Sequence, residues 1–145
     1  MNRHTARELA FKALFGLDFA PEKTLDTLES LWAEKIAEGK IPPEKLVDFS
    51  RELVRGVIEK RERLDEIIRR RAIGWDFKRL AKVDKTLLRL ALYEMLYRPD
   101  IDIPVSIDEA VELAKVYGEE ESPKFINGIL GYVAEHIDEF WEDNK

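Results

Sequence analysis

Apolar residues recur every three or four positions along most of this 145-residue chain, which is the spacing of one face of an α-helix. No segment sustains the alternation of apolar and polar residues that a half-buried strand requires. Short connections favour helices that pack antiparallel around one core. We therefore predict an all-α fold, a single compact domain of about seven helices over residues 1–145. The predicted helices cover approximately residues 5–17, 25–38, 42–71, 76–80, 84–97, 107–117 and 123–141.

Local signals set the starts of three of these helices. Thr5 with Glu8, and Ser106 with Glu109, have the spacing of a capping box, in which a hydroxyl accepts the N–H of the third helical residue. Pro123 suits a first helical turn, because no hydrogen-bond donor is missed there. The helix over residues 84–97 is apolar on nearly every side, so we predict that it is the buried central element.

Composition narrows the class of protein. Hydrophobic residues make up 45% and charged residues 37% of the chain, which argues against disorder. The apolar runs are too short to cross a membrane. The chain has no cysteine and no N-terminal signal pattern, so we expect no disulfide and a cytoplasmic location.

The net charge of −6 is unevenly distributed along the chain. Residues 69–89 hold eight basic and two acidic residues, whereas residues 100–145 hold thirteen acidic and three basic residues. Such polarity can hold an anion on one side of a protein. The alternative is that the basic residues only solvate helix surfaces and pair with acids, and the charge pattern leaves both interpretations open.

No catalytic constellation is present. His4 and His136 lie at opposite ends of the chain, and neither has the spacing of a helical metal site. There is no glycine-rich phosphate loop, no nucleophile elbow and no cysteine nucleophile. We therefore predict a protein that is not an enzyme and needs neither a cofactor nor a metal ion.

Binding is the remaining class of function. Arg3, His4 and Arg7 cluster at the first helix start, where positive charge opposes the helix dipole, so we favour a phosphate contact there. The arginines of residues 69–71 end a helix, where cations are favoured anyway, so structural and functional roles stay open.

Aromatic and polar residues add to these candidates. Phe15 belongs to a stripe that is usually core, but an exposed ring could stack a base. Phe125 lies beside the apolar face of its helix, next to Lys124, and we favour a contact role. Asn127 could bond a base edge or join two helices, and both stay open. Gly128 costs a helix roughly 1 kcal/mol, which is typical of a place that something approaches closely.

Three segments together resemble the NusB family of transcription antitermination factors. The strongest is residues 104–130, which carry EA-ELAK-YG, a short acidic loop and KF-NG-L. The segment TARELAFKALF resembles the family's first helix, and RLAKVDKTLLRLALYEML resembles its central helix. The dense N-terminal arginine run of many family members is reduced here to Arg3, His4 and Arg7.

The resemblance implies an all-helical, non-catalytic protein that pairs with NusE, a small-subunit ribosomal protein. It implies binding to single-stranded boxA RNA of nascent ribosomal RNA leaders, within the RNA polymerase antitermination complex. The RNA-binding residues that we predict are Arg3, His4, Arg7, Phe15, Arg70, Arg71, Lys124, Phe125 and Asn127. The partner-binding residues that we predict are Lys82, Asp84, Lys85, Arg89 and Glu94.

Two other functions are compatible with the pattern. The chain could be a helical protein–protein adaptor that uses its apolar central helix. NusB-like domains also precede ribosomal RNA cytosine methyltransferases, but the methyl-donor-binding α/β domain and the catalytic cysteine of those enzymes are missing here. Whether the free protein is a monomer or a homodimer is left open.

Overall fold

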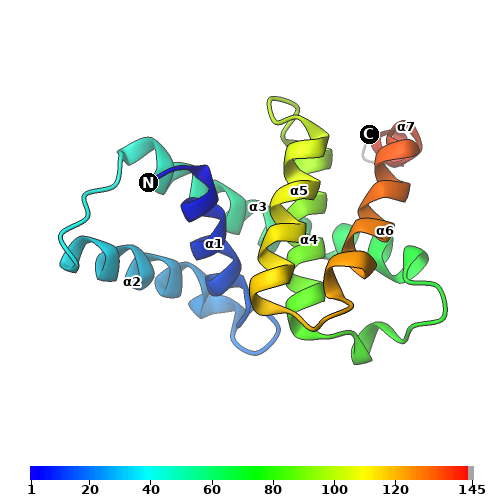
Figure 1. Ribbon diagram of the computed structural model, residues 1–145, viewed down its shortest axis with the longest axis horizontal. Helices are drawn as coiled ribbons and strands as arrows, with labels where there is room; N and C mark the ends of the chain where they lie inside the picture. Colours follow the sequence, from blue (N-terminus) through cyan, green and yellow to red (C-terminus); the bar gives the residue numbers. More distant parts are fainter. Residues whose placement is uncertain (144–145) are drawn as a thin grey trace. The chain divides into compact units, whose positions relative to one another are not determined.

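Helices account for nearly all of the structure. The computed structural model describes residues 1–143, and no strand occurs among them, which confirms the all-α prediction (Figure 1). The chain forms two compact units, residues 1–59 and residues 60–145, and each is described by itself. That the two make one domain over residues 1–145 stays a prediction.

The N-terminal unit contains two helices and part of a third. Its elements are α1 (Arg3–Leu14), η1 (Pro21–Lys23), α2 (Thr24–Ala37) and the first part of α3 (Glu44–Arg71). Helix α1 packs against α2. The Ser50 hydroxyl of α3 donates to the Ala6 carbonyl oxygen of α1 at 2.9 Å, and Arg51 donates to Glu29 of α2 at 2.6 Å. These bonds join α3 to both of the other helices.

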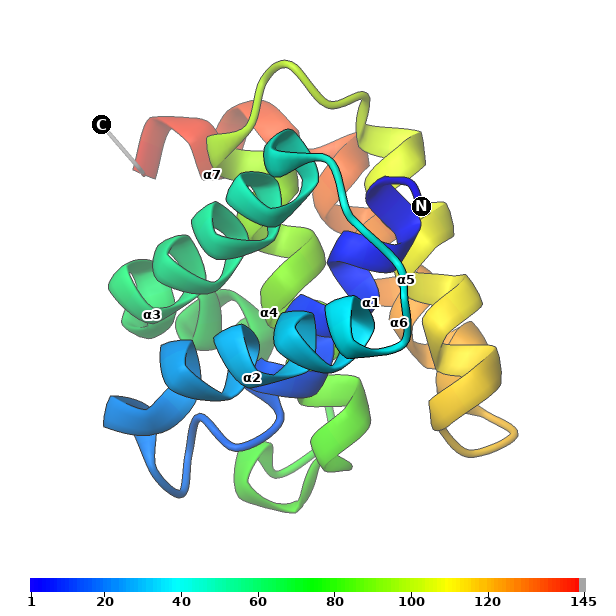
Figure 2. The ribbon, with the colours of Figure 1, turned by 90° about the vertical axis from the view of Figure 1, so that its left-hand side faces the viewer.

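The C-terminal unit is built on three neighbouring helices, α4, α5 and α6, each of which contacts the other two, and α5 runs antiparallel to α4 and α6 (Figures 1 and 2). Helix α7 contacts α4 and α6. Besides the end of α3, the elements of this unit are η2 (Phe77–Arg79), α4 (Lys82–Tyr97), α5 (Ile103–Tyr117), α6 (Ser122–Glu135) and α7 (Ile137–Asp143).

Helix α4 is the buried centre of the C-terminal unit. Every residue from Thr86 to Leu96 is buried, including Leu87, Leu88 and Leu92, which have no exposed surface. The central-helix prediction is therefore confirmed within this unit. A helix that is buried on all sides needs a partner for each polar side chain that it carries, because an unpaired buried charge is costly.

Both predicted capping boxes are wrong. Helix α1 begins two residues before Thr5, because Asn2 is its N-cap and accepts the Thr5 N–H at 3.3 Å. Helix α5 begins at Ile103, after the N-cap Asp102. Ser106 therefore lies inside the helix, where it is buried and its hydroxyl donates to Glu94 of α4 at 2.8 Å. Its hydroxyl satisfies a buried carboxylate instead of a helix end.

The predicted final helix is two helices. Helix α6 ends at Glu135, and α7 follows the C-cap residue His136. The His136 N–H still bonds to the Tyr132 and Val133 carbonyl oxygens, and its Nδ1 atom lies 2.9 Å from the Tyr132 oxygen. His136 thus provides hydrogen-bond partners for the last carbonyl groups of α6, and the helix ends there. The apolar spacing continues past this point, which is why the sequence predicted one helix. By contrast, Asp76 caps η2 as predicted, by accepting the Lys78 N–H at 3.1 Å.

The central position of α4 can be tested by truncating one side chain. Leu92→Ala should lower the free energy of unfolding by about 2–5 kcal/mol, because it removes a fully buried side chain and leaves a cavity. Val116→Ala on α5 is the control, and it should change stability by less than about 0.5 kcal/mol, because Val116 is exposed. Urea unfolding followed by circular dichroism gives both values. A loss below about 1 kcal/mol for Leu92→Ala would show that α4 is peripheral.

Candidate nucleic-acid interface

A groove of about 490 Å³ opens on the C-terminal unit between the end of α3 and one face of α6. The α6 residues that line it are spaced three or four apart, so they share one helix face. Two cations, one carboxylate and three aromatic rings are among the lining residues. The full lining is Arg71, Ala72, Ile73, Trp75, Glu121, Lys124, Phe125, Gly128, Ile129 and Tyr132.

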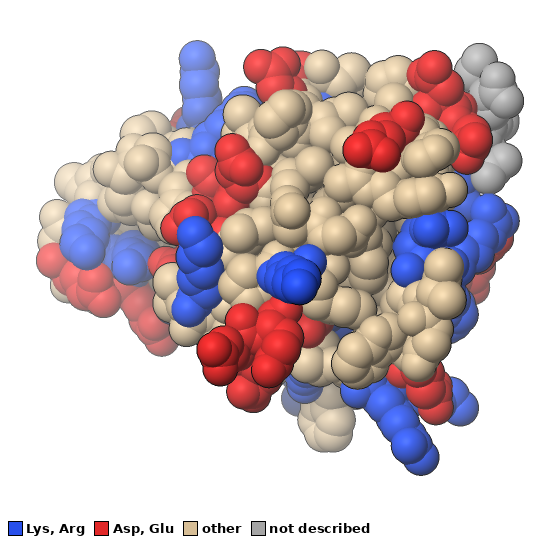
Figure 3. Space-filling view, turned by 45° about the vertical axis from the view of Figure 1, so that its right-hand side comes forward, with Lys and Arg blue, Asp and Glu red and all other residues tan. Residues whose placement is uncertain are grey.

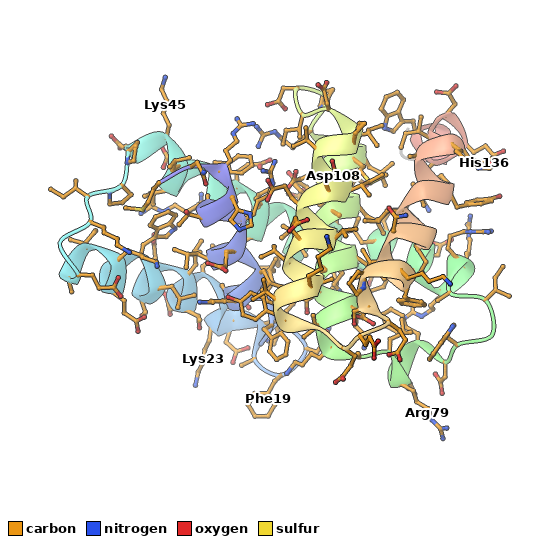
Figure 4. All side chains as sticks on the ribbon, viewed as in Figure 1. Phe19, Lys23, Lys45, Arg79, Asp108 and His136 are labelled. Atoms are coloured by element: carbon orange, nitrogen blue, oxygen red, sulfur yellow. The ribbon has the colours of Figure 1, made fainter. Side chains whose placement is uncertain are left out.

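Three ring contacts lie at the walls of this groove. Trp75 packs edge-to-face on Phe125, with 5.5 Å between ring centroids. The Arg71 guanidinium lies 3.5 Å above the Tyr132 ring centroid, and Tyr132 in turn stacks on His136 at 4.1 Å. His136 lies where α6 meets α7 (Figure 4). The groove thus brings cations and flat rings together, the combination that binds single-stranded nucleic acid.

Cations of the predicted arginine run have different roles. Arg71 lines the groove, and its buried Nε has no hydrogen-bond partner among the described residues. Arg70 pairs with Glu66 one turn earlier, and Arg69 lies 4.4 Å above the Phe77 ring centroid. In Figure 3, the Lys and Arg atoms gather at the right-hand edge beside an uncharged area, and acidic atoms form separate clusters. Of the two predicted residues Arg70 and Arg71, Arg71 is the one that faces the groove.

Three predicted α6 residues lie at or beside the groove. Lys124 is exposed and Phe125 is half-buried, and both line it. Asn127 is exposed beside this face, and its side chain has no hydrogen-bond partner within residues 1–143, which favours a contact role over a cross-link. A methyl group built on Gly128 would meet no atom within 4 Å. Internal packing therefore does not require this glycine, and its surface is open to the groove.

The predicted residues of the first helix belong to the N-terminal unit. The guanidinium groups of Arg3 and Arg7 lie 4.3 Å and 5.3 Å from the Phe49 ring centroid. Arg3 is exposed and His4 is half-buried, but Arg7 is only 3% exposed. Burial gives Arg7 a packing role and makes it a poor phosphate contact. Phe15 is half-buried and packs edge-to-face on Phe11, with 5.9 Å between ring centroids.

Three of the five predicted partner-binding residues have buried side chains. Arg89 donates to both oxygens of the Asp65 carboxylate on α3, at 2.7 Å and 2.9 Å. Glu94 accepts the Ser106 hydroxyl of α5. Asp84 shares a hydrogen bond with Ser122 of α6. These three residues hold α4 to its neighbours. Of the other two, Lys82 is exposed and Lys85 lies 4.4 Å from the Phe77 ring centroid.

The loop before α6 is tightly packed at Ser122. The Ser122 hydroxyl oxygen accepts the Glu119 N–H at 3.0 Å, while the hydroxyl also bonds the Asp84 carboxyl. A methyl group on Gly118 would lie 2.6 Å from that oxygen, so a glycine is required there. Desolvation by burial raises the pKa of Asp84; the Ser122 bond opposes this, and the Glu119 carboxylate adds to it.

Sequence reasoning missed Trp75 and Tyr132. Trp75 follows Gly74 in a turn inside the basic segment 69–89, which was a usable signal, because turns place side chains in solvent. Tyr132 lies one turn after Gly128 and two turns after Lys124. The helical period therefore places it on the same α6 face, where it lines the groove.

Comparison with known proteins agrees with the earlier resemblance. The NusB family pattern matches residues 4–135 of the chain. The chain belongs to the NusB family. It is 98% identical to the transcription antitermination protein NusB of Carboxydothermus hydrogenoformans, over 99% of this chain and 100% of that protein. This confirms the predicted resemblance.

Solved structures also match the fold. A crystal form of T. maritima NusB superposes with a TM-score of 0.82, at 39% identity, over 98% of each chain. A crystal structure of the antitermination factors NusB and NusE in complex with dsRNA has a TM-score of 0.80, at 25% identity, over 94% of this chain and 99% of that one. None of the described helices is both long and apolar enough to span a membrane.

The buried Asp65–Arg89 pair predicts that Arg89 matters for stability. Arg89→Ala should lower the free energy of unfolding by about 3–5 kcal/mol, because the buried Asp65 carboxylate loses the two hydrogen bonds that Arg89 donates and keeps the longer 4.0 Å ion pair with Arg61. Replacing both residues, as in Arg89→Met with Asp65→Leu, should cost less than the single change. Chemical unfolding of both variants checks this order, and the opposite order would show that the pair is not a buried constraint.

The raised pKa of Asp84 gives a pH-dependent prediction. Above the folded-state pKa the carboxylate is charged and desolvated, so it lowers stability, and this penalty fades as the pH falls toward the unfolded value. Asp84→Asn should therefore unfold at a higher temperature than wild type at pH 7, with a difference that shrinks on acidification. Asp84→Ala, which also loses the Ser122 bond, is the control, and its unfolding temperature should rise less than that of Asp84→Asn. A constant difference across the pH range would exclude this cause.

Proposed function

We propose that this chain is a transcription antitermination factor that binds single-stranded boxA RNA of nascent ribosomal RNA leaders together with NusE. The observation that carries the proposal is the groove that Arg71 and Lys124 line together with three aromatic rings. The NusB of Carboxydothermus hydrogenoformans, at 98% identity, is a transcription antitermination protein. The RNA-bound pair would join the RNA polymerase antitermination complex and promote read-through.

Charge supports this position for the RNA. A protein with a net charge of −6 repels a polyanion except where its own charge is locally reversed. The segment of residues 69–89 is such a place, with eight basic and two acidic residues, and Arg71 and Trp75 of the groove belong to it. Lys124 supplies a second cation from the otherwise acidic chain after residue 100. Phosphates are therefore held best along this groove.

The groove also suits the bases of a single strand. Flat rings beside cations bind unpaired bases by stacking, while the cations contact the backbone. The open surface at Gly128 lets a nucleotide approach the α6 backbone, and Asn127 beside it can bond a base edge. Arg3, His4 and Phe15 of the N-terminal unit stay part of the proposal as further RNA contacts.

NusE is the proposed protein partner, and the crystal structure that contains NusB, NusE and dsRNA supports this choice. Of the predicted contact residues, Lys82 and Lys85 are the ones that a partner can reach. Asp84, Arg89 and Glu94 act from inside, by holding the helices that form the docking face. The protein works by binding and not by catalysis, and we place it in the cytoplasm with the transcribing polymerase.

The decisive experiment compares two double variants of equal charge. Arg71→Ala with Lys124→Ala removes both groove cations, whereas Lys23→Ala with Lys115→Ala removes two exposed cations outside it. Binding of labelled boxA RNA is measured by fluorescence anisotropy over a range of salt, with and without NusE. The groove variant should bind more weakly, and its salt slope should fall by about 0.7 for each lost phosphate contact. The control should resemble wild type.

The same titration distinguishes the alternatives. Equal RNA binding by both double variants would place the RNA outside the groove and contradict the proposal. A wild-type protein that binds NusE but no RNA would be the helical adaptor.

A further inference from the structure

Trp75 is the most conspicuous feature of the groove that phosphate binding does not explain. It is 61% exposed, although an indole is among the largest apolar groups that a protein can bury. It lies in the turn between α3 and η2, where Gly74 has a φ of +84°, a conformation that side chains other than glycine rarely adopt. This turn places the ring outside the helical core.

The Trp75 ring is held in place although it is exposed. Its backbone N–H bonds to the Ala72 carbonyl oxygen at 3.0 Å, and its ring meets the Phe125 ring edge-to-face at an interplanar angle of 62°. A ring that is already oriented loses little freedom when a ligand stacks on it. Phe125 is half-buried beneath this contact, so Trp75 is the ring with more open surface.

We propose that Trp75 is the base-stacking platform of the groove and that it makes the protein prefer single-stranded over double-stranded RNA. This inference rests on the proposed function, because it assumes that RNA occupies the groove. Unpaired bases can leave the strand and stack on an aromatic side chain, whereas the base faces of a duplex are covered by their neighbours. The cations can bind the phosphates of either form, so the discrimination comes from the rings, and Trp75 is the most exposed of them.

Charge favours RNA as the occupant over an apolar protein surface. Arg71 and Lys124 line the same groove as Trp75, and the buried Arg71 Nε has no partner among the described residues. A protein that covered Trp75 with apolar side chains would bury these cations at an electrostatic cost, while a nucleotide offers a phosphate and a base together. A protein partner at this site is an outcome that the test below detects.

The experiment measures the affinity of the full chain for one RNA sequence as a single strand and as a duplex. The variants are Trp75→Ala, the conservative Trp75→Phe, and the control Phe19→Ala, which removes a 90% exposed ring from the α1–η1 connection (Figure 4). Loss of one stacked base costs ~1–3 kcal/mol, so Trp75→Ala should weaken single-strand binding about 5- to 140-fold. Duplex affinity and the salt slope should not change. Trp75→Phe should recover part of the loss, and Phe19→Ala should match wild type.

Fluorescence provides a second readout that a structural defect would not imitate. Single-stranded RNA should quench the tryptophan emission of the wild type, and the quenching should be much smaller in Trp75→Phe, although that variant still binds RNA. Trp32 is buried and Trp141 lies outside the groove, so neither should replace this signal.

Three results would overturn the inference. Trp75→Ala could weaken single-strand and duplex binding equally, or leave both unchanged while Arg71→Ala with Lys124→Ala still loses RNA. In either case the proposed function stands and the platform is rejected. Trp75→Ala could instead lose NusE and keep RNA, which would assign the ring to a protein partner. A wild-type protein that binds no RNA would contradict the proposed function itself.

Discussion

The C-terminal unit depends on the contacts that the three buried charged side chains of α4 make with neighbouring helices. Each of them turns to a different neighbour: Asp84 to α6, Arg89 to α3 and Glu94 to α5. Apolar packing alone tolerates sliding and rotation of one helix on another, because it has little direction. A buried charge resists such sliding and rotation, because a movement that separates it from its partner costs several kcal/mol of stability. Polar links to these helices therefore set the register of the unit.

The groove is a consequence of this register. Its two walls are the end of α3 with the turn after it and one face of α6, and these are the helices that Arg89 and Asp84 contact. The tight contact between Gly118 and Ser122 then fixes the loop from which α6 begins. The buried Asp84 carboxyl bonds Ser122 at the start of α6. Because Lys124 and Phe125 follow Ser122 in the same helix, this bond also positions them. Asp84 and Arg89, which the sequence indicates as partner contacts, are thus buried residues that support the walls of the groove.

The distribution of charge gives an acidic protein a locally basic surface. Most of its carboxylates lie in segments that do not line the groove, and Glu121 is the acidic member of the lining. The basic side chains of residues 69–89 make different contacts. Arg70 pairs with Glu66, and Arg69 and Lys85 lie against the Phe77 ring. Arg71 lines the groove. The net charge of a protein thus predicts little about its partners, and the local field at the binding surface predicts more.

The sequence by itself determined the helical class, the burial of α4 and the family, because helical periodicity and local motifs are properties of short segments. It also indicated Lys124 and Phe125 as candidate contact residues, because they lie in the same short segment as Asn127 and Gly128. Only the tertiary structure decided the roles of Ser106 and Arg89. Ser106 has the spacing of a cap, yet its partner is a glutamate of another helix, and Arg89 has the charge of a surface contact, yet its partner is a buried aspartate. Trp75 gained its importance in the same way, because its contact with Phe125 joins segments fifty residues apart in the chain. Such pairings depend on which helix faces meet, and no local pattern of residues contains that information.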